Sequence, residues 1–257
     1  MPTNPENLFT LTGRTALVTG ASSGIGHAIA HALGHAGASL ILVARRPQPL
    51  TDTLHQLHDH GIPAAAIPAD LTNPHDITRI CQQAATHFGD IDILVNNAAN
   101  NIRRPMTDLT PDDYHQTITL NLTAPYLLGQ HFGPRMAQRG WGRIINIGSQ
   151  QSIKAFGDSG AYGISKAAIT GLTRSQAEAW SPHGVCANTI IPGFVLTPLT
   201  EPAQAIPGRV EALAARSMIG RNATPDDFTG IAVFLASNAS AYITGQTICV
   251  DGGFSVH

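Results

Sequence analysis

The sequence predicts a doubly wound α/β fold, in which helices cover both faces of a seven-stranded parallel sheet. Apolar runs rich in β-branched residues alternate along the chain with segments of helical periodicity. Runs such as Leu-Ile-Leu-Val at 40–43 are apolar at every position, as expected of strands that are covered on both faces. The first run leads directly into a glycine-rich turn and an alanine-rich helical segment, which is the strand, turn and helix order of such a sheet.

The expected elements alternate over the whole chain, which we treat as a single domain of residues 1–257. The expected strands are 14–19, 39–44, 63–68, 91–96, 142–148, 185–191 and 246–250. The expected helices are 24–36, 50–60, 74–88, 111–138, 157–180 and 225–236. Thr110 before Pro111 indicates a capped helix start. The interval 198–221 breaks the alternation, and its proline, alanine and polar residues are typical of a mobile flap over a site.

Charge and hydropathy exclude several kinds of partner. The 257 residues include 15 Lys and Arg and 17 Asp and Glu, giving a net charge of -2, and no basic run exceeds two residues. Such a surface favours neither nucleic acid nor an anionic membrane. No segment approaches the ~18 apolar residues of a membrane span, and the N-terminus lacks the features of a signal peptide. We therefore expect a cytoplasmic protein whose partner is a small molecule.

The cysteines and histidines indicate no disulfide framework and no metal site. Cys81, Cys186 and Cys249 are few, odd in number and set among apolar residues, so we expect reduced thiols in the core. Among the 12 histidines, His55 and His58 lie close together with His60. No cysteine or carboxylate completes a coordination set at zinc spacing, so we interpret them as a solvated helix face.

The turn after the first expected strand reads Thr-Gly-Ala-Ser-Ser-Gly-Ile-Gly at 19–26. Its glycines permit a tight turn and let the backbone approach a pyrophosphate, whose charge would face the amides of a helix N-terminus. An ordinary glycine-rich turn is the alternative, but the strand before it and the helix after it favour phosphate binding. We expect the phosphates of a dinucleotide to contact Gly20, Ser22, Ser23, Gly24, Ile25 and Gly26.

The second expected strand ends in Ala44, followed by Arg45 and Arg46. A carboxylate at this place would hold a ribose 2′-hydroxyl and repel a 2′-phosphate. An uncharged residue followed by two guanidiniums instead suits a 2′-phosphate, because Arg makes charge-assisted bonds to phosphate oxygens. We therefore prefer NADP(H) over NAD(H). The alternative is that one or both Arg are solvated loop charges, and Arg46, next to Pro47, is the weaker candidate.

Tyr162, Lys166 and Ser149 form the candidate catalytic group. Tyr162 and Lys166 are four residues apart on an expected helix and share a face, while Ser149 ends the fifth expected strand. Making a phenolate at pH 7 costs about 4 kcal/mol for a free tyrosine. An ammonium at ~4 Å supplies roughly as much at an effective dielectric of about 20. With the positive nicotinamide ring, Lys166 could make Tyr162 an acid/base, and Ser149 could hydrogen-bond the substrate oxygen.

With these residues the chain resembles the short-chain dehydrogenase/reductase family over nearly its whole length. The matching motifs are TGASSGIG at 19–26, Asp-Leu-Thr at 70–72, Asn-Asn-Ala-Ala at 96–99, Asn121, Ser149, Tyr162-x-x-x-Lys166, Pro192-Gly193, Thr197 and Val-Asp-Gly-Gly at 250–253. The chain departs from the family at Ala99, where Gly is usual, and at Ser22 and Ser23, where NADP users often carry a basic residue.

The resemblance implies a catalytic tetrad of Asn121, Ser149, Tyr162 and Lys166, with Asn121 fixing a water that links Lys166 to solvent. It also implies further cofactor contacts, beside Tyr162 and Lys166 themselves. Asp70 and Asn97 would border the adenine side, and Pro192, Gly193 and Thr197 would hold the nicotinamide. The further expected cofactor contacts are Leu71, Ala98, Ala99 and Val195. A homotetramer is the oligomeric state that the resemblance implies.

The segments 100–105 and 148–151 are similar to those of the family's sugar-acid members, such as gluconate 5-dehydrogenase and 2-deoxygluconate dehydrogenase. We expect a secondary alcohol or ketone of the gluconate or ketogluconate type as substrate, with contacts from Ser149, Gln150, Arg104 and Tyr162. Arg103 and Arg104 could receive a carboxylate. The alternative for this Arg pair is a salt bridge at a subunit contact or a helix cap.

Other functions remain open at this stage. A reductase of 3-oxoacyl thioesters shares every catalytic residue but calls for a basic docking surface, of which the sequence shows no cluster. A reductase of polyols or other ketones is a further possibility. A nucleotide-sensing binding module, or a scaffold with no ligand, is disfavoured because Ser149, Tyr162 and Lys166 are all present.

Overall fold

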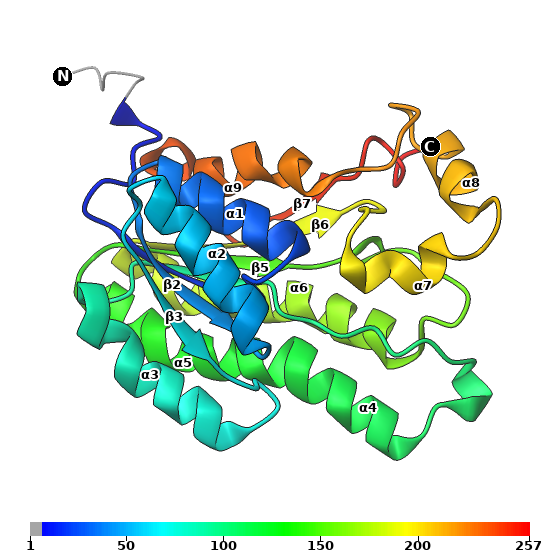
Figure 1. Cartoon of the computed structure of the whole chain (residues 1–257), viewed down its shortest axis with the longest axis horizontal. Coiled ribbons are helices and arrows are strands. Elements are labelled where there is room, and N and C mark those ends of the chain that lie inside the picture. The colour runs from blue at the N-terminus through cyan, green and yellow to red at the C-terminus, as the bar shows by residue number, and fades with distance from the viewer. Residues whose placement is uncertain (1–6) are drawn as a thin grey trace.

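The computed structural model describes residues 7–257, which form an α/β fold around one parallel sheet (Figure 1). The sheet has seven strands within this range, in the order β3-β2-β1-β4-β5-β6-β7, and all neighbours are parallel. The strands are β1 (Thr15–Thr19), β2 (Ser39–Ala44), β3 (Ala64–Pro68), β4 (Ile93–Asn96), β5 (Gly142–Ile147), β6 (Val185–Pro192) and β7 (Thr247–Val250). The predicted fold class is confirmed.

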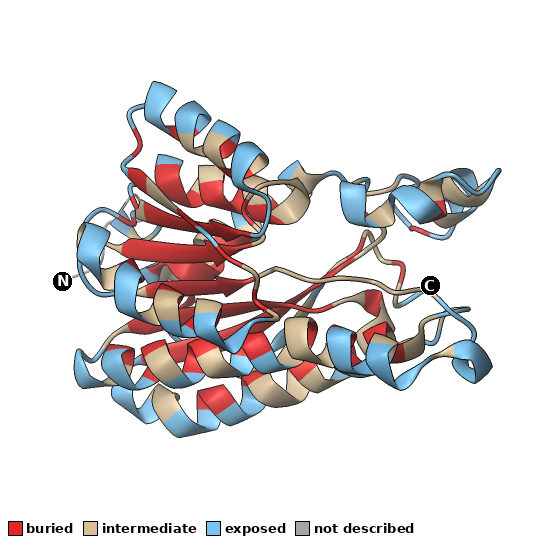
Figure 2. Cartoon of the chain, turned by 60° about the horizontal axis from the view of Figure 1, so that its bottom comes forward, coloured by how far each residue is buried: buried red, intermediate tan, exposed pale blue. Residues whose placement is uncertain are grey.

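Helices form a layer on each face of the sheet (Figure 1). One layer holds α1 (Gly24–His35), α2 (Pro47–Asp59) and α9 (Thr229–Ala236), and the other holds α3 (Pro74–Phe88), α4 (Pro111–Ile118), α5 (Ala124–Gln138) and α6 (Gly160–Trp180). Figure 2 shows the strands as the most buried part of the molecule. β1 and β4 are buried at every position, and β2 is buried at every position after Ser39, which explains their continuous apolar sequence.

The strand order places the site. β1 and β4 are neighbours, so the chain runs outward from β1 to β3 and then returns to the centre and continues toward β7. Ligands of such sheets bind in the crevice where the order reverses, beyond the carboxyl ends of the strands. The loops after β1, β2, β4, β5 and β6 all open at that edge.

The helix predicted over 111–138 is not one continuous α-helix. A π-type turn at Thr119–Thr123 separates α4 from α5, and Asn121 lies within it. Helical periodicity does not reveal such a turn, because one extra residue shifts the register without breaking the helix. The predicted start at 157 is also wrong: Asp158 and Gly160 have φ values of 56° and 49°, so α6 begins only at Gly160.

The interval 198–221 is folded in this structure. A 3-10 turn at Pro198–Thr200 leads into two short helices, α7 (Glu201–Gln204) and α8 (Arg209–Ala215). Both project beyond the carboxyl ends of the strands, at the right of Figure 1. The other 3-10 turns are Met106–Asp108, Gln150–Ser152, Ser181–His183, Pro225–Phe228 and Asn238–Ser240.

The three cysteines are unpaired, but they do not share one environment. Cys186 is buried and Cys81 is partly buried, and burial raises the pKa of the Cys81 thiol to about 11. Cys249 is exposed on the edge strand β7, which corrects the expectation of a core thiol. Over residues 7–257, no His, Cys, Asp and Glu side chains are grouped so that three could hold a metal ion. None of the helices in that range is long and apolar enough to cross a membrane.

Candidate active site

Two adjoining cavities of about 370 Å³ each lie at the carboxyl edge of the sheet. The first extends over the ends of β1, β2 and β3, and the second over the ends of β5 and β6. The lining residues common to both are Ile25, Asn97, Ala99, Thr197 and Leu199. The two cavities therefore form one cleft, with room for an elongated ligand that passes from β3 to β6.

The glycine loop after β1 borders the first cavity. Gly20 and Gly24 have φ values of 68° and 58°, in the region that favours glycine. A Cβ on Gly20 or on the buried Gly26 would collide with the amide of Asn97, which donates to the carbonyls of Thr19 (3.1 Å) and Gly20 (3.3 Å). The loop glycines thus let the loop close against β4.

The N-terminus of α1 faces the same cavity. α1 begins at Gly24, and Ser23 in the capping position makes no side-chain hydrogen bond to the first turn. Ser22, Ser23 and Gly24 all line the cavity. The amides of this first turn are therefore available to an anion, so the residues present fit the pyrophosphate of a dinucleotide.

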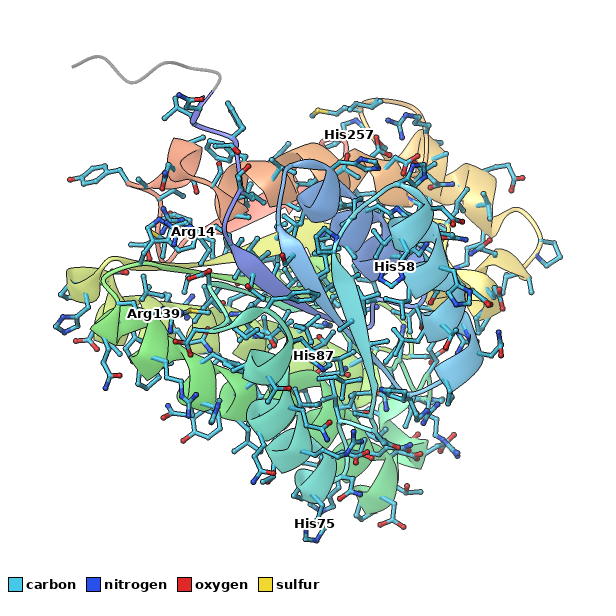
Figure 3. The ribbon with its side chains drawn as sticks, turned by 60° about the vertical axis from the view of Figure 1, so that its left-hand side comes forward. Arg14, His58, His75, His87, Arg139 and His257 are labelled. Carbon is cyan, nitrogen blue, oxygen red and sulfur yellow. The ribbon has the colours of Figure 1, made fainter. Side chains whose placement is uncertain are left out.

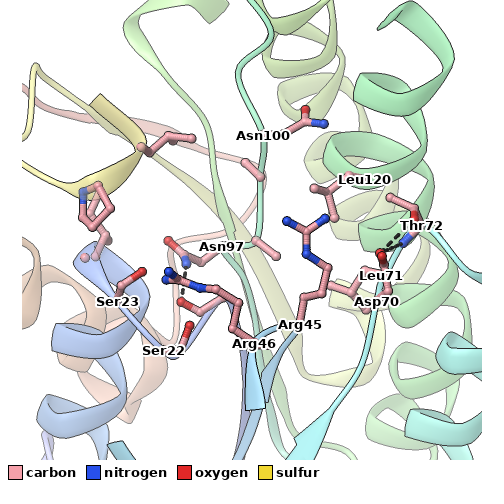
Figure 4. Close-up of a pocket in the computed structure, with 18 of the residues that line it drawn as sticks. Ser22, Ser23, Arg45, Arg46, Asp70, Leu71, Thr72, Asn97, Asn100 and Leu120 are labelled. Carbon is pink, nitrogen blue, oxygen red and sulfur yellow. Dashed lines mark hydrogen bonds between the residues drawn. The ribbon is translucent and has the colours of Figure 1, made fainter. Parts of the chain in front are cut away.

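Arg45 and Arg46 both line the first cavity, and both are exposed. In Figure 4 they point into it, Arg46 on the side of Ser22 and Arg45 on the side of Asp70. Asp70 Oδ1 accepts hydrogen bonds from the backbone N–H (2.9 Å) and the hydroxyl (2.8 Å) of Thr72, which orients the carboxylate. Among the described residues, Asp70 is the one acidic side chain that lines the cavity, and it lies beyond β3 and not at the end of β2.

The structure brings almost all of the sequence-predicted cofactor residues to this cleft. Those lining it are Gly20, Ser22, Ser23, Gly24, Ile25, Arg45, Arg46, Asp70, Leu71, Asn97, Ala98, Ala99, Tyr162, Lys166, Pro192, Gly193, Val195 and Thr197. Gly26 is the exception, because it is buried behind the loop that it helps to close. Its effect on a ligand is therefore indirect.

Ser149, Tyr162 and Lys166 meet in the second cavity. Ser149 follows β5, and its hydroxyl is hydrogen-bonded to Tyr162 from the first turns of α6. Lys166 Nζ donates to the carbonyl of Ile147 at 2.7 Å and lies 5.7 Å from the centre of the Tyr162 ring. Tyr162 and Lys166 are both buried, with 7% and 3% of their surface exposed.

Burial shifts both side chains toward their neutral forms. It raises the pKa of Tyr162, an effect that the hydrogen bond with Ser149 partly offsets. It lowers the pKa of Lys166 to about 8. Lys166 by itself therefore does not make Tyr162 a phenolate at neutral pH, because the ammonium is itself poorly solvated. A Tyr162 phenolate would therefore also require the positive charge of a bound nicotinamide ring.

Both polar atoms of the Asn121 side chain form hydrogen bonds with other residues of the protein. Its Oδ1 accepts the backbone N–H of Asn100 (2.9 Å), and its Nδ2 donates to the Asn100 carbonyl (3.0 Å) and to Ser165 Oγ (3.1 Å). Ser165 in turn donates to the carbonyl of Tyr162 at 2.8 Å. Asn121 therefore ties the loop after β4 to the helix that carries Tyr162 and Lys166.

Of the two further residues expected to contact the substrate, Gln150 lines the second cavity and Arg104 does not. Gln150 lines the second cavity and is 5% exposed. Arg104 lines neither cavity: its Nε pairs with Asp113 Oδ2 at 3.1 Å, and Asp113 closes the capping box at the start of α4. The expected contact of Arg104 with the substrate is therefore corrected. Arg104 instead forms a salt bridge at a helix cap, which was the alternative, because the Asp113 carboxylate lies within ion-pair distance of its guanidinium.

Arg103 and Arg209 supply the guanidiniums of the second cavity instead. Arg103 Nη2 donates to the carbonyl of Gly157 at 2.8 Å. Sequence reasoning missed Arg209 because it lies in the irregular interval 198–221, where no periodicity predicts which side chain points inward. Only the fold brings Arg209 to the cavity that Tyr162 also lines.

Comparison with known proteins supports the resemblance noted above. A family model described as enoyl-(acyl carrier protein) reductase matches residues 20–255. The chain is 34% identical to gluconate 5-dehydrogenase of Gluconobacter oxydans, over 97% of this chain and 98% of the relative. It is 38% identical to 2-dehydro-3-deoxy-D-gluconate 5-dehydrogenase of Bacillus subtilis (97% and 97%). It is 35% identical to a tropinone reductase homolog of Arabidopsis thaliana (98% and 97%).

Solved structures are similar over the whole fold. A gluconate 5-dehydrogenase of Burkholderia cenocepacia in complex with NADP and tartrate has a TM-score of 0.94 and 33% identity, covering 99% of this chain and 100% of that one. A protein of Beutenbergia cavernae, provisionally an NAD(P)-dependent gluconate 5-dehydrogenase with NADP bound, has a TM-score of 0.93 and 40% identity (97% and 99%). A short-chain type dehydrogenase/reductase of Mycobacterium marinum has a TM-score of 0.90 and 33% identity (96% and 98%). The chain belongs to the short-chain dehydrogenase/reductase family.

Proposed function

We propose that this protein is an NADP-dependent oxidoreductase that interconverts a secondary alcohol and a ketone on a sugar acid. The observation that carries the proposal is the charge of the cavity around Tyr162. Within residues 7–257, its charged lining residues are Arg103, Lys166 and Arg209, and no Asp or Glu of that range lines it. Such a lining favours an anionic substrate. Relatives named for gluconate and ketogluconate chemistry support a carboxylated polyol as that anion.

The chemistry follows from the positions of Tyr162 and Ser149. A bound nicotinamide dinucleotide supplies or accepts the hydride at the substrate carbon. In ketone reduction, the Tyr162 hydroxyl gives its proton to the substrate oxygen, and Ser149 hydrogen-bonds that oxygen as charge develops on it. In alcohol oxidation, the Tyr162 oxygen takes the hydroxyl proton. Burial of Tyr162 keeps the hydroxyl protonated at neutral pH, which suits the reductive direction.

After Tyr162 has given its proton to the substrate, Lys166 and Asn121 serve to return a proton to it. Lys166 carries an ammonium or amine near neutral pH because burial lowers its pKa to about 8, so it can exchange a proton. We assign the connecting water to the backbone carbonyl of Asn121 and not to its side chain, whose amide is already bonded. Pro125, four residues later, has no N–H to donate to that carbonyl. Asn121 is then a positioning residue.

The preference for NADP rests on the end of β2. Ala44, Arg45 and Arg46 line the first cavity there, without a carboxylate that would repel a 2′-phosphate. Ser22 and Ser23 add hydroxyls from the glycine loop. Structural neighbours solved with NADP support the same cofactor.

The remaining parts of the proposal concern motion, assembly and location. We propose that residues 198–221 act as a flap of a single domain, because they contribute Leu199, Arg209 and other side chains to the second cavity.

A homotetramer is supported by exposed apolar residues on α5 and α6, Tyr126 and Ile164, and by the exposed edge strand β7. A cytoplasmic location is supported by the unpaired cysteines. Hydrogen exchange with and without NADP, and light scattering, test the first two.

One activity screen tests the function. The purified protein is assayed with NADP(H) and NAD(H) against gluconate, 5-ketogluconate, deoxy sugar acids, neutral polyols and a 3-oxoacyl thioester. We expect the highest kcat/KM with NADP(H) and a sugar acid. Equal activity on carboxylated and neutral substrates rejects the sugar-acid proposal, and preference for the thioester replaces it with the acyl reductase alternative. Full turnover by Tyr162→Phe contradicts the assigned chemistry.

A further inference from the structure

The proposed function leaves open which side chain of the cavity receives the substrate carboxylate. Three cationic side chains line the cavity, and they differ in what already binds them. Lys166 Nζ donates to the carbonyl of Ile147 and lies beside Tyr162, where it serves the proton chemistry. Arg103 Nη2 donates to the carbonyl of Gly157 and so holds the loop before α6. Each of these two side chains is therefore already held by a backbone carbonyl.

Arg209 differs from both. Its side chain makes no hydrogen bond and no ion pair with any residue in 7–257, and its Nε is buried without a partner. The buried Nε–H of Arg209 therefore lacks an acceptor, which a bound anion would supply. Arg209 and Leu213 lie four residues apart on α8, and both line the cavity. One face of α8 is therefore directed toward the ligand.

A second unpartnered donor lies in the same cavity. Gln150 is 5% exposed, lines the cavity directly after Ser149, and its Nε2 donates to no acceptor within the described residues. Buried side-chain amides normally have hydrogen-bond partners, so a free one at a site indicates a ligand. Gln150 and Arg209 reach the cavity from different segments, the end of β5 and residues 198–221.

We propose that Arg209 is the residue that selects a carboxylated substrate, binding the carboxylate by charge-assisted hydrogen bonds, with Gln150 as a neutral donor to the same ligand. This inference rests on the proposed function, and it adds that the specificity comes from the flap and not from the Arg103–Arg104 segment after β4. Because Arg209 lies on 198–221, the carboxylate also holds the flap over the reacting carbon.

The test compares the best sugar acid of the screen with its carboxamide, which replaces the charge by a neutral group of the same shape. The variants are Arg209→Gln, Arg209→Lys and, as a matched control, Arg216→Gln. Arg216 lies just after α8 and stacks on Phe254 at 4.3 Å, and it does not line the cavity. NADPH affinity, measured by fluorescence, is expected to change little in all variants, because Arg209 does not line the first cavity, where the glycine loop, Arg45 and Arg46 would hold the phosphates.

For Arg209→Gln we expect kcat/KM for the acid to fall about 10- to 100-fold, mainly through KM, as for the loss of a charge-assisted hydrogen bond. The carboxamide is expected to change less than about threefold, so the acid-to-amide ratio collapses. Arg209→Lys keeps the charge and should retain most of the ratio. Arg216→Gln should behave as the wild type.

The outcomes separate the two proposals. A wild-type protein that turns over the acid and the amide equally overturns the sugar-acid function before any variant is made. A wild-type preference for the acid that survives in Arg209→Gln overturns only the role of Arg209, and Arg103→Gln then identifies the alternative. Equal losses on acid and amide in both Arg209 variants indicate a structural role and also overturn the inference.

Discussion

Lys166 is a buried cation held by a single backbone carbonyl. Its Nζ donates to Ile147 O at 2.7 Å, and burial lowers its pKa from 10.5 to about 8. The folded protein therefore binds this proton more weakly than the unfolded chain does. Below pH 8 the charged form destabilises the fold, and the effect disappears as the pH rises toward 10.5. Lys166 therefore lowers the stability of the folded protein, and its role in proton transfer explains why a lysine stands at this position.

Lys166→Met should therefore be inactive and more stable. At pH 7 we expect a gain of about 1 to 3 kcal/mol, since a shift of one pKa unit corresponds to about 1.4 kcal/mol and the lost hydrogen bond removes part of it. The gain should be smaller at pH 9.5. Urea unfolding at the two pH values measures this. An equal difference at both would show that the buried charge is not its cause.

Arg45 and Arg46 differ from Lys166 in being exposed, so their effect should appear in cofactor choice. For Arg45→Ala we expect the NADP-to-NAD ratio of kcat/KM to fall about 10- to 100-fold, as for the loss of a guanidinium–phosphate contact. Figure 4 shows Arg46 pointing into the same cavity, so Arg46→Ala is compared directly. Arg174→Ala, exposed on α6, is the control. A ratio unchanged in both cavity variants means that the two are solvated loop charges.

At the scale of elements, α1 and α2 meet through histidines. Three histidines recur at every fourth position of α1, namely His27, His31 and His35, and His60 lies directly after the last residue of α2. The ring centres of the neighbouring pairs among these four histidines are 4.5 to 6.5 Å apart. Burial first, and then the neighbouring imidazoles, lower the pKa of His31. Gln56 of α2 is hydrogen-bonded to His27 at 2.9 Å, and Asp226 lines a separate surface pocket together with His27, His31 and His35.

This contact should weaken in acid. A lowered pKa means that the stability which neutral His31 contributes above pH 6.5 is lost as the pH falls through the folded value. His31→Gln should therefore be more stable than the wild type by ~0.5 kcal/mol at pH 5.5 and unchanged at pH 8, the small size reflecting solvent screening. Urea unfolding measures both. His75→Gln, on a separate exposed histidine shown in Figure 3, should show no such difference.

Across the whole molecule, stability and chemistry are concentrated at opposite ends of the sheet. At the amino ends, Asp92 Oδ2 accepts the backbone N–H of Thr15 at 3.1 Å. Its Oδ1 lies 3.6 Å from Arg14 and 3.4 Å from Arg139, two side chains labelled in Figure 3. Asp92 thus joins β1, β4 and the end of α5. The cleft lies at the other edge.

Asp92→Ala should lower the free energy of unfolding by about 1 to 3 kcal/mol, because the N–H of Thr15 and two guanidiniums lose their acceptor. kcat and KM should stay within twofold at 25 °C, since the site is at the far edge of the sheet. Asp90→Ala is the matched control, because Asp90 is half-exposed and forms an ion pair with the same Arg139 at 3.2 Å, and it should cost under about 0.5 kcal/mol. A loss of activity equal to the loss of stability would contradict this separation.

The sequence by itself determined the features that depend on neighbours along the chain. Alternating apolar runs predicted the seven strands, and local spacing identified the glycine loop and the pair of Tyr162 and Lys166. Only the tertiary structure decided what depends on approach between distant segments. It directed Arg104 to Asp113, placed Arg209 in the cavity that Tyr162 lines, and inserted the π-type turn at Asn121. Periodicity records which face of an element is buried, but not which charged group lies closest in space.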